Sequence, residues 1–290
     1  MSLGLDNPFL DPLLWSKIQL NKDDVIIGTY AKFGNLRIQI IVQAIIEASK
    51  ESYSRSLPWV ELRHQQSEVR IDTVNKSEGR RVLRTHLPAN YSYNTVSNFI
   101  FVGRDPRDLV WNLYTFHSRF DERLHSYYSQ YGFPSFDENL SFKAYWERWM
   151  QDDGFPFWPY FEHLYSWWKL KDQENVLFLH YLDFQKNMEG VIQEICKILD
   201  ISIPEKDWSR FMRLCNFDTV SMVSETDVNI ESPFWNGGLS KAGEGQRIRE
   251  SINWKECLNQ SDENDLRGRL KEWVGHEGED WILRGLMHHQ

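Results

Sequence analysis

The sequence lacks the features of secreted, metal-stabilised and membrane-spanning proteins. It has three cysteines among 290 residues, and Cys196, Cys215 and Cys257 form no C-x-x-C pair, which argues against a disulfide framework and a structural zinc site. No stretch reaches the roughly eighteen apolar residues that a membrane-spanning helix needs. The first residues show neither a basic nor an apolar signal region, so we expect a cytoplasmic protein with no membrane partner.

Positive charge is scarce as well. The 33 Lys and Arg residues are outnumbered by 42 Asp and Glu residues, which gives a formal net charge of −9. A general nucleic-acid surface must neutralise many phosphates with Lys and Arg. We therefore expect no nucleic-acid partner, and any anion site must be a local basic pocket in an acidic protein.

Aromatic residues, in contrast, are abundant: they make up 14% of the chain, with 13 tryptophans. Many lie between residues 145 and 168, namely Tyr145, Trp146, Trp149, Phe155, Phe157, Trp158, Tyr160, Phe161, Tyr165, Trp167 and Trp168. They form either a core seam between helices or the wall of a pocket for an apolar or aromatic substrate, because large rigid rings with polar tips suit both. Composition leaves both interpretations open, and Phe157 and Trp158 are the pocket candidates under the second.

Hydrophobic periodicity predicts an α/β fold. Buried strands are expected over residues 24–29, 81–88, 98–103 and 175–181, and helices over 38–49, 109–120 and 188–199. Successive strand–helix units imply a parallel sheet with right-handed crossovers. We expect one domain over 1–290, with an initial surface segment over 1–22, an exposed polar stretch up to Arg80 and a Gly-rich loop over 236–247.

The first strand–turn–helix unit has the layout of a phosphate-binding loop. Its strand leads into a turn with Lys32 and Gly34, and such a turn directs backbone N–H groups and the positive end of a helix dipole at one anion. The complete G-x-x-x-x-G-K-[ST] pattern is absent, since Phe33 follows the lysine. The segment alone is therefore also compatible with an ordinary turn that carries a solvated lysine.

A second unit places a charged turn behind the strand over 98–103. Arg104 follows that strand directly, and Asn112 comes eight residues later (112 − 104 = 8), about two helical turns along. We expect Asn112 to face the same groove as Arg104. Asp105 precedes Pro106 and is expected to be the N-cap of the helix.

Taken together, these segments resemble the sulfotransferases that use 3′-phosphoadenosine-5′-phosphosulfate, of the cytosolic and bacterial types. Arg84-Thr-His-Leu-Pro88 is similar to the family motif K-T-H-L-P, and Arg104-Asp-Pro-Arg-Asp108, with Asn112, is similar to R-[DN]-P-[KR]-D-x-x-x-S. Looser matches are Tyr181-Leu-Asp183 to Y-E-D, Cys215-Asn-Phe217 to T-S-F and residues 240–247 to R-K-G-x-x-G-x-W. The opening motif T-Y-P-K-S-G-T-T-W is matched at Thr29, Tyr30, Lys32 and Gly34 but not at Ala31, Phe33, Asn35, Leu36 and Arg37.

The resemblance implies a P-loop-like three-layer α/β fold with a central, mainly parallel sheet flanked by helices. It also implies transfer of a sulfuryl group from 3′-phosphoadenosine-5′-phosphosulfate to a hydroxyl of a small apolar or aromatic acceptor, with no metal. His86 would be the general base, and Lys32 would hold the transferred group. The donor-binding residues would be Lys32, Gly34, Asn35, Leu36, Arg37, Arg104, Asn112, Tyr181, Phe217, Lys241 and Arg247, and the acceptor-binding residues His86, His163, Phe157 and Trp158.

Two other functions stay open at this level. Phe33, Asn35 and Leu36 replace three hydroxyl donors, each worth roughly 1–3 kcal/mol when it serves a charged group, so one alternative is a nucleotide-binding protein impaired in catalysis. A P-loop kinase for a small metabolite is disfavoured because no magnesium-binding Ser or Thr follows Lys32. No motif identifies the acceptor or the oligomeric state.

Overall fold

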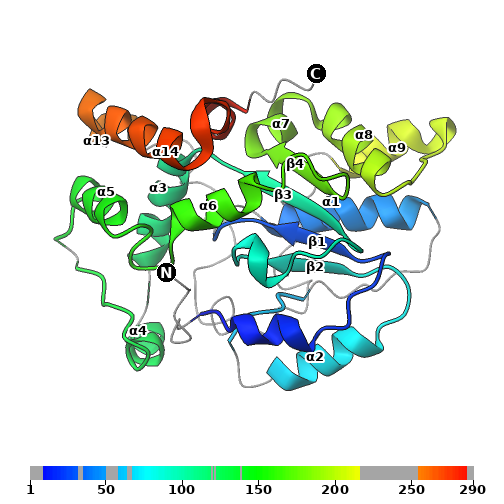
Figure 1. Cartoon of the computed structure of the whole chain (residues 1–290), viewed down its shortest axis with the longest axis horizontal. Coiled ribbons are helices and arrows are strands. Elements are labelled where there is room, and N and C mark those ends of the chain that lie inside the picture. The colour runs from blue at the N-terminus through cyan, green and yellow to red at the C-terminus, as the bar shows by residue number, and fades with distance from the viewer. Residues whose placement is uncertain are drawn as a thin grey trace. The chain divides into compact units, whose positions relative to one another are not determined.

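A parallel sheet forms the centre of the fold. The computed structural model describes residues 9–31, 35–49, 58–63, 67–118, 120, 122–137, 139–215 and 254–285. Within these ranges, four parallel strands form one sheet in the order β2-β1-β3-β4 (Figure 1). They are β1 Val25–Gly28, β2 Val82–Thr85, β3 Asn98–Gly103 and β4 Val176–His180. The predicted α/β class with a parallel sheet is confirmed.

The chain divides into two compact units. The sheet unit comprises residues 10–104 and 166–229, and the helical unit comprises residues 1–9, 105–165 and 230–290. The single domain expected from the sequence stays a prediction. None of the helices in the described ranges combines the length and the apolar character needed to cross a bilayer.

One face of the sheet is covered by helices α1 (Asn35–Ala48), α8 (Met188–Ile198) and α9 (Glu205–Leu214) (Figure 1). Side chains on alternate strand positions point to the same face, and most of these positions are apolar here, with Arg84 on β2 as an exception. The strands contribute Val25, Ile27, Val82, Ile100, Val102, Leu177 and Leu179 to this cluster. Full burial of each such side chain contributes about 1.5–3 kcal/mol to stability, so this face is the main core of the sheet unit.

The opposite face of the sheet contacts Trp167, near the end of helix α6 (Tyr160–Trp168). The indole stacks on Phe101, with ring centroids 5.1 Å apart and planes 14° from parallel. Its Nε1 donates to the carbonyl of Leu87 over 3.1 Å. A Cβ on Gly28 would lie 2.5 Å from the indole, so this close approach of β1 requires glycine.

Two local features differ from the sequence-based expectation. The polar stretch before Arg80 contains helix α2 (Ser67–Lys76), in which Ile71 and Val74 are buried; it packs beside the 3-10 helix η1 (Pro12–Lys17). A second 3-10 helix, η2 (Ala89–Tyr91), follows β2.

Strand β4 ends at His180, so Tyr181 belongs to helix α7 (Tyr181–Lys186) and is not a strand residue. The cause is a capping box between His180 and Asp183, which satisfies N–H groups that the first helical turn leaves unpaired.

The helical unit contains α3 (Pro106–His117), α4 (Glu122–Ser129), α5 (Phe142–Gln151), the start of α6, α13 (Trp254–Cys257) and α14 (Gln260–Arg284). Asp105 caps α3 as expected, since its side chain accepts from the backbone N–H of Arg107 over 2.9 Å. The indole of Trp254 donates to Asp108 over 2.8 Å, and the Arg107 guanidinium lies 4.2 Å from the Trp254 ring centroid. These two contacts hold α13 against the first turn of α3.

Most residues of the aromatic stretch are core residues. Trp146, Trp149, Tyr160 and Phe161 are each less than 2% exposed, which favours the core-seam interpretation for them. A further group of rings surrounds His117, at centroid distances between 5.0 and 6.4 Å: Phe120, Phe133, Phe136, Tyr145 and Phe157. Burial lowers the pKa of His117 to about 4, so this imidazole is neutral at physiological pH.

Candidate active site

Three predicted site residues, His86, Arg104 and Tyr181, lie at the carboxyl edge of the sheet together with the motif residue Thr29. Gly28 is in register with Thr85, so Thr29 and His86 follow paired positions on β1 and β2. Gly103 is in register with His180, so Arg104 and Tyr181 follow paired positions on β3 and β4. Parallel strands end at the same edge of their sheet, which is where open α/β sheets bind ligands.

His86 is anchored by the residue that follows β1. Its Nδ1 lies 2.9 Å from the backbone carbonyl of Thr29 and 3.0 Å from the Thr29 hydroxyl. A carbonyl oxygen can only accept a hydrogen bond, so in neutral His86 the proton is on Nδ1 and the lone pair is on Nε2. This assignment, which rests on the hydrogen-bond geometry, leaves Nε2 as the basic nitrogen.

Glu61, which was not among the predicted site residues, contacts the backbone of His86. Its Oε1 accepts from the backbone N–H of His86 over 2.6 Å and from the indole of Trp59 over 2.7 Å. Its Oε2 accepts from the indole of Trp15 over 2.8 Å. The carboxylate is fully buried; burial raises the pKa of Glu61, and the three N–H donors oppose this rise.

The segment that carries Glu61 is held beside β2 by backbone hydrogen bonds. Arg84 N–H donates to the carbonyl of Pro58 over 3.2 Å, and Val60 N–H donates to the carbonyl of Arg84 over 3.4 Å. The only sequence signal for Glu61 is an acidic residue between apolar neighbours, Trp59-Val60 and Leu62. A buried carboxylate requires hydrogen-bond donors, but the sequence does not reveal that they come from residues 46 and 25 positions away.

Arg104 and Tyr181 form a stacked pair. The guanidinium carbon of Arg104 lies 4.5 Å from the centroid of the Tyr181 ring, within the range of a cation–π contact. The residue after Arg104, Asp105, belongs to the helical unit; its carboxylate accepts from Arg107, from Nε over 2.9 Å and from Nη2 over 2.6 Å. Stacking leaves the edge of a guanidinium, with its fork of N–H donors, suited to a planar or tetrahedral anion.

The other predicted site residues fall into two groups. Asn112, half-buried on α3, and His163, buried on α6, belong to the helical unit, as do the buried Phe157 and Trp158; their roles stay predictions. Several residues lie outside the described ranges, namely Lys32, Gly34, Phe217, Lys241 and Arg247. Asn35, Leu36 and Arg37 form the first turn of α1, but their side chains are not among those described.

The described residues include no group of three or more His, Cys, Asp or Glu side chains that could hold a metal ion; the absence of a metal stays a prediction. All three cysteines are free thiols, with Cys196 and Cys215 buried.

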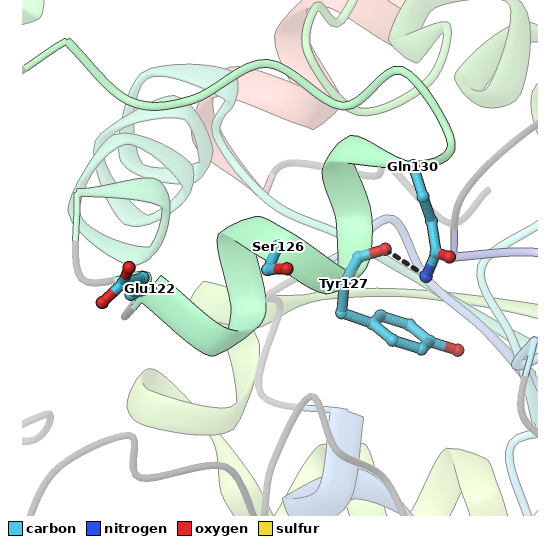
Figure 2. A pocket seen from close by; sticks show the side chains of 4 residues that line it. All are labelled: Glu122, Ser126, Tyr127 and Gln130. Atoms are coloured by element: carbon cyan, nitrogen blue, oxygen red, sulfur yellow. Dashed lines mark hydrogen bonds between the residues drawn. The ribbon is translucent and has the colours of Figure 1, made fainter.

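A surface hollow runs along α4 (Figure 2). Glu122, Ser126, Tyr127 and Gln130 line it, and the Gln130 amide donates to the Tyr127 carbonyl over 2.7 Å. None of these four residues was a predicted site residue. We assign the hollow no role in the proposed reaction.

A family model described as "Sulfotransferase domain" matches residues 22–262. The chain belongs to the sulfotransferase domain family. This sulfotransferase is thus a transferase enzyme, and the resemblance drawn from its motifs is confirmed. It is 24% identical to Sulfotransferase 1 family member D1 of Mus musculus over 258 residues, which cover 79% of this chain and 82% of that protein. It is also 24% identical to Sulfotransferase 1C2 of Homo sapiens over 279 residues, with 90% and 81% covered.

Solved structures match the sulfotransferase fold. Mouse sulfotransferase SULT7A1 complexed with PAP superposes with a TM-score of 0.66 at 17% identity and covers 94% of this chain and 92% of its own. Retinol dehydratase in complex with androsterone and PAP superposes with a TM-score of 0.57 at 21% identity, over 88% and 82% of the two chains. The P-loop-like α/β fold expected from the motifs is confirmed.

Proposed function

We propose that this sulfotransferase moves a sulfuryl group from 3′-phosphoadenosine-5′-phosphosulfate to a hydroxyl of a small apolar or aromatic acceptor. The observation that carries the proposal is the contact between His86 Nδ1 and the Thr29 carbonyl at the carboxyl edge of the sheet. Thr29 fixes the Nδ1–H side of the ring, so Nε2 can take the proton of an acceptor hydroxyl as it attacks. Imidazole titrates near neutrality, which suits a general base at physiological pH.

The described residues fit an adenosine phosphosulfate donor. When bound, this donor supplies an activated sulfuryl group and a phosphate leaving group. The Arg104 guanidinium, stacked on Tyr181, suits the 3′-phosphate. Helix α1 follows β1 in the chain, and its first turn offers backbone N–H groups to an anion. Lys32, Gly34, Asn35, Leu36, Arg37, Asn112, Phe217, Lys241 and Arg247 complete the proposed donor site. PAP in two solved relatives supports this choice of donor.

The choice of an apolar or aromatic acceptor rests on the many aromatic residues of the helical unit. His163, Phe157 and Trp158 are the proposed acceptor-side residues together with His86. Androsterone is named in the retinol dehydratase complex, and an apolar alcohol of that kind suits an aromatic surface. A cytoplasmic location and the absence of nucleic-acid and membrane partners stay predictions.

Two measurements on the wild-type protein test the proposal. Addition of 3′,5′-adenosine bisphosphate should raise the melting temperature, because a ligand that binds only the native state stabilises it. Incubation with 3′-phosphoadenosine-5′-phosphosulfate and a panel of phenols and alcohols should give a sulfated product by mass spectrometry. Stabilisation without any product would favour the impaired nucleotide-binding protein, and no stabilisation at millimolar nucleotide would contradict the choice of donor.

A further inference from the structure

Glu61 joins η1 and its own segment to the main chain of His86. It receives one N–H from η1, through Trp15, one from its own segment, through Trp59, and one from the residue that follows β2, His86. The Trp59 ring also packs edge-on against the His86 imidazole, with centroids 4.7 Å apart and planes at 81°. Glu61 is thus linked to the imidazole in two ways. It accepts from the backbone N–H of His86, and it accepts from the Trp59 indole, which packs against the His86 ring.

Stability alone does not account for a carboxylate at this position. Glu61 is 0% exposed, and within the described part of the chain its hydrogen bonds come from two indoles and one peptide rather than from a cation. Taking a carboxylate out of water is costly unless donors replace the lost hydration. An apolar side chain of the same size would avoid that cost, so the carboxylate points to a positional role.

Glu61 and Thr29 divide the positioning of His86 between them. Thr29 holds Nδ1, whereas Glu61 holds the backbone N–H and the orientation of Trp59. The guanidinium carbon of Arg84, on β2, lies 5.3 Å from the Trp59 ring centroid. We propose that Glu61 is a second positioning residue of His86: it holds the backbone N–H and the Trp59 ring, and so keeps the imidazole in the plane in which Nδ1 contacts Thr29 and the lone pair stays on Nε2. This role rests on the proposed sulfuryl transfer.

The test compares Glu61→Gln and Glu61→Ala with a control that loses another buried carboxylate. Asp24, 0% exposed, pairs with Arg81 at the opposite end of β1, so Asp24→Asn destabilises the sheet unit without a contact to His86. Per folded molecule, we expect kcat to fall about tenfold in Glu61→Gln and about a hundredfold in Glu61→Ala, the scale of a catalytic group misplaced by about 1 Å. KM for the donor should stay within about twofold of wild type, because only the base moves.

A readout without turnover separates this proposal from the proposed function. In protein labelled with ring-¹⁵N histidine, the two nitrogen shifts distinguish a protonated from an unprotonated nitrogen, and the His86 signals are those missing from His86→Gln. We expect one Nδ1–H form in wild type and Asp24→Asn, and a mixture with the Nε2–H form in both Glu61 variants. A purely structural carboxylate would lower the melting temperature and leave this signature unchanged.

The outcomes are distinct. An unchanged His86 signature in the Glu61 variants, with kcat equal to that of Asp24→Asn, would overturn the positioning role. If wild type forms no sulfated product, the proposed function fails, and the ¹⁵N signature alone decides on Glu61. If Glu61→Ala does not fold, the isosteric Glu61→Gln decides by the same two measures.

Discussion

His86 and His117 are both buried imidazoles, but their surroundings differ and favour different roles. In each of them one ring nitrogen lies within hydrogen-bond distance of a backbone carbonyl. Nδ1 of His86 lies 2.9 Å from the carbonyl oxygen of Thr29, and Nε2 of His117 lies 3.0 Å from that of Pro134. The lone pair is therefore on Nε2 in His86 and on Nδ1 in His117. His86 stands at a strand end beside Glu61, whereas His117 is enclosed by aromatic rings and its Nδ1 has no hydrogen-bond partner among the described residues. Since both imidazoles are buried, the proposed role of His86 as general base rests on its position at the strand end and on the nitrogen that Thr29 holds.

The largest effect is expected from the loss of the base. His86→Ala should lower turnover about 10²- to 10⁴-fold, the usual contribution of a general base. Stabilisation by 3′,5′-adenosine bisphosphate should stay close to that of wild type, because the proposed donor site lies on other strand ends. Product formation and thermal shift measure the two quantities, and wild-type turnover in the variant would show that His86 is not the base.

His117→Ala should lower the stability of the protein and leave the binding of the donor nucleotide unchanged. The truncation opens a cavity among the surrounding rings, and we expect the free energy of unfolding to fall by about 3 kcal/mol, as for other large buried side chains. Urea unfolding measures this loss. The prediction fails if stability is unchanged, or if nucleotide stabilisation is lost while the protein stays folded.

The stability of the protein should depend on pH through His117. Burial lowers the pKa of His117 to about 4 in the folded state, against about 6.5 for an unfolded chain. Between these values the unfolded state binds more protons, so the stability from neutral His117 is complete above about pH 6.5 and is lost as pH falls toward 4, by up to about 3 kcal/mol.

His117→Phe should flatten this slope. Burial raises the pKa values of Glu61 and Asp105, which gives these groups the opposite pH dependence, but both are present in wild type and variant. Urea unfolding of the two proteins between about pH 4 and 7 isolates the His117 contribution. Parallel curves would contradict the neutral imidazole.

The strand ends that carry the candidate site were predictable from the sequence, but the surroundings of His86 and His117 were not. The strands before Thr29, His86 and Arg104 follow from local apolar patterns, and the rule for parallel strands places their ends at one edge. Glu61 was missed because its partners Trp15 and His86 are distant in the sequence, and no local pattern encodes such contacts. The helix over 67–76 was missed because only Ile71 and Val74 are buried on it.

The smallest effect is expected from Thr29→Val. This change removes the hydroxyl 3.0 Å from Nδ1 but keeps the backbone carbonyl at 2.9 Å. Since one neutral hydrogen bond contributes about 1 kcal/mol, turnover should fall less than about tenfold. A loss comparable to that of His86→Ala would mean that the hydroxyl, and not the carbonyl, sets the tautomer.

The contrast between the two histidines is tested most directly by ring-¹⁵N spectra of the wild-type protein near neutral pH, with signals assigned from His86→Gln and His117→Phe. We predict that His86 carries its proton on Nδ1 and that His117 carries its proton on Nε2. A His86 imidazole protonated on Nε2 would leave no lone pair there for the acceptor proton and would contradict the assignment of His86 as the base.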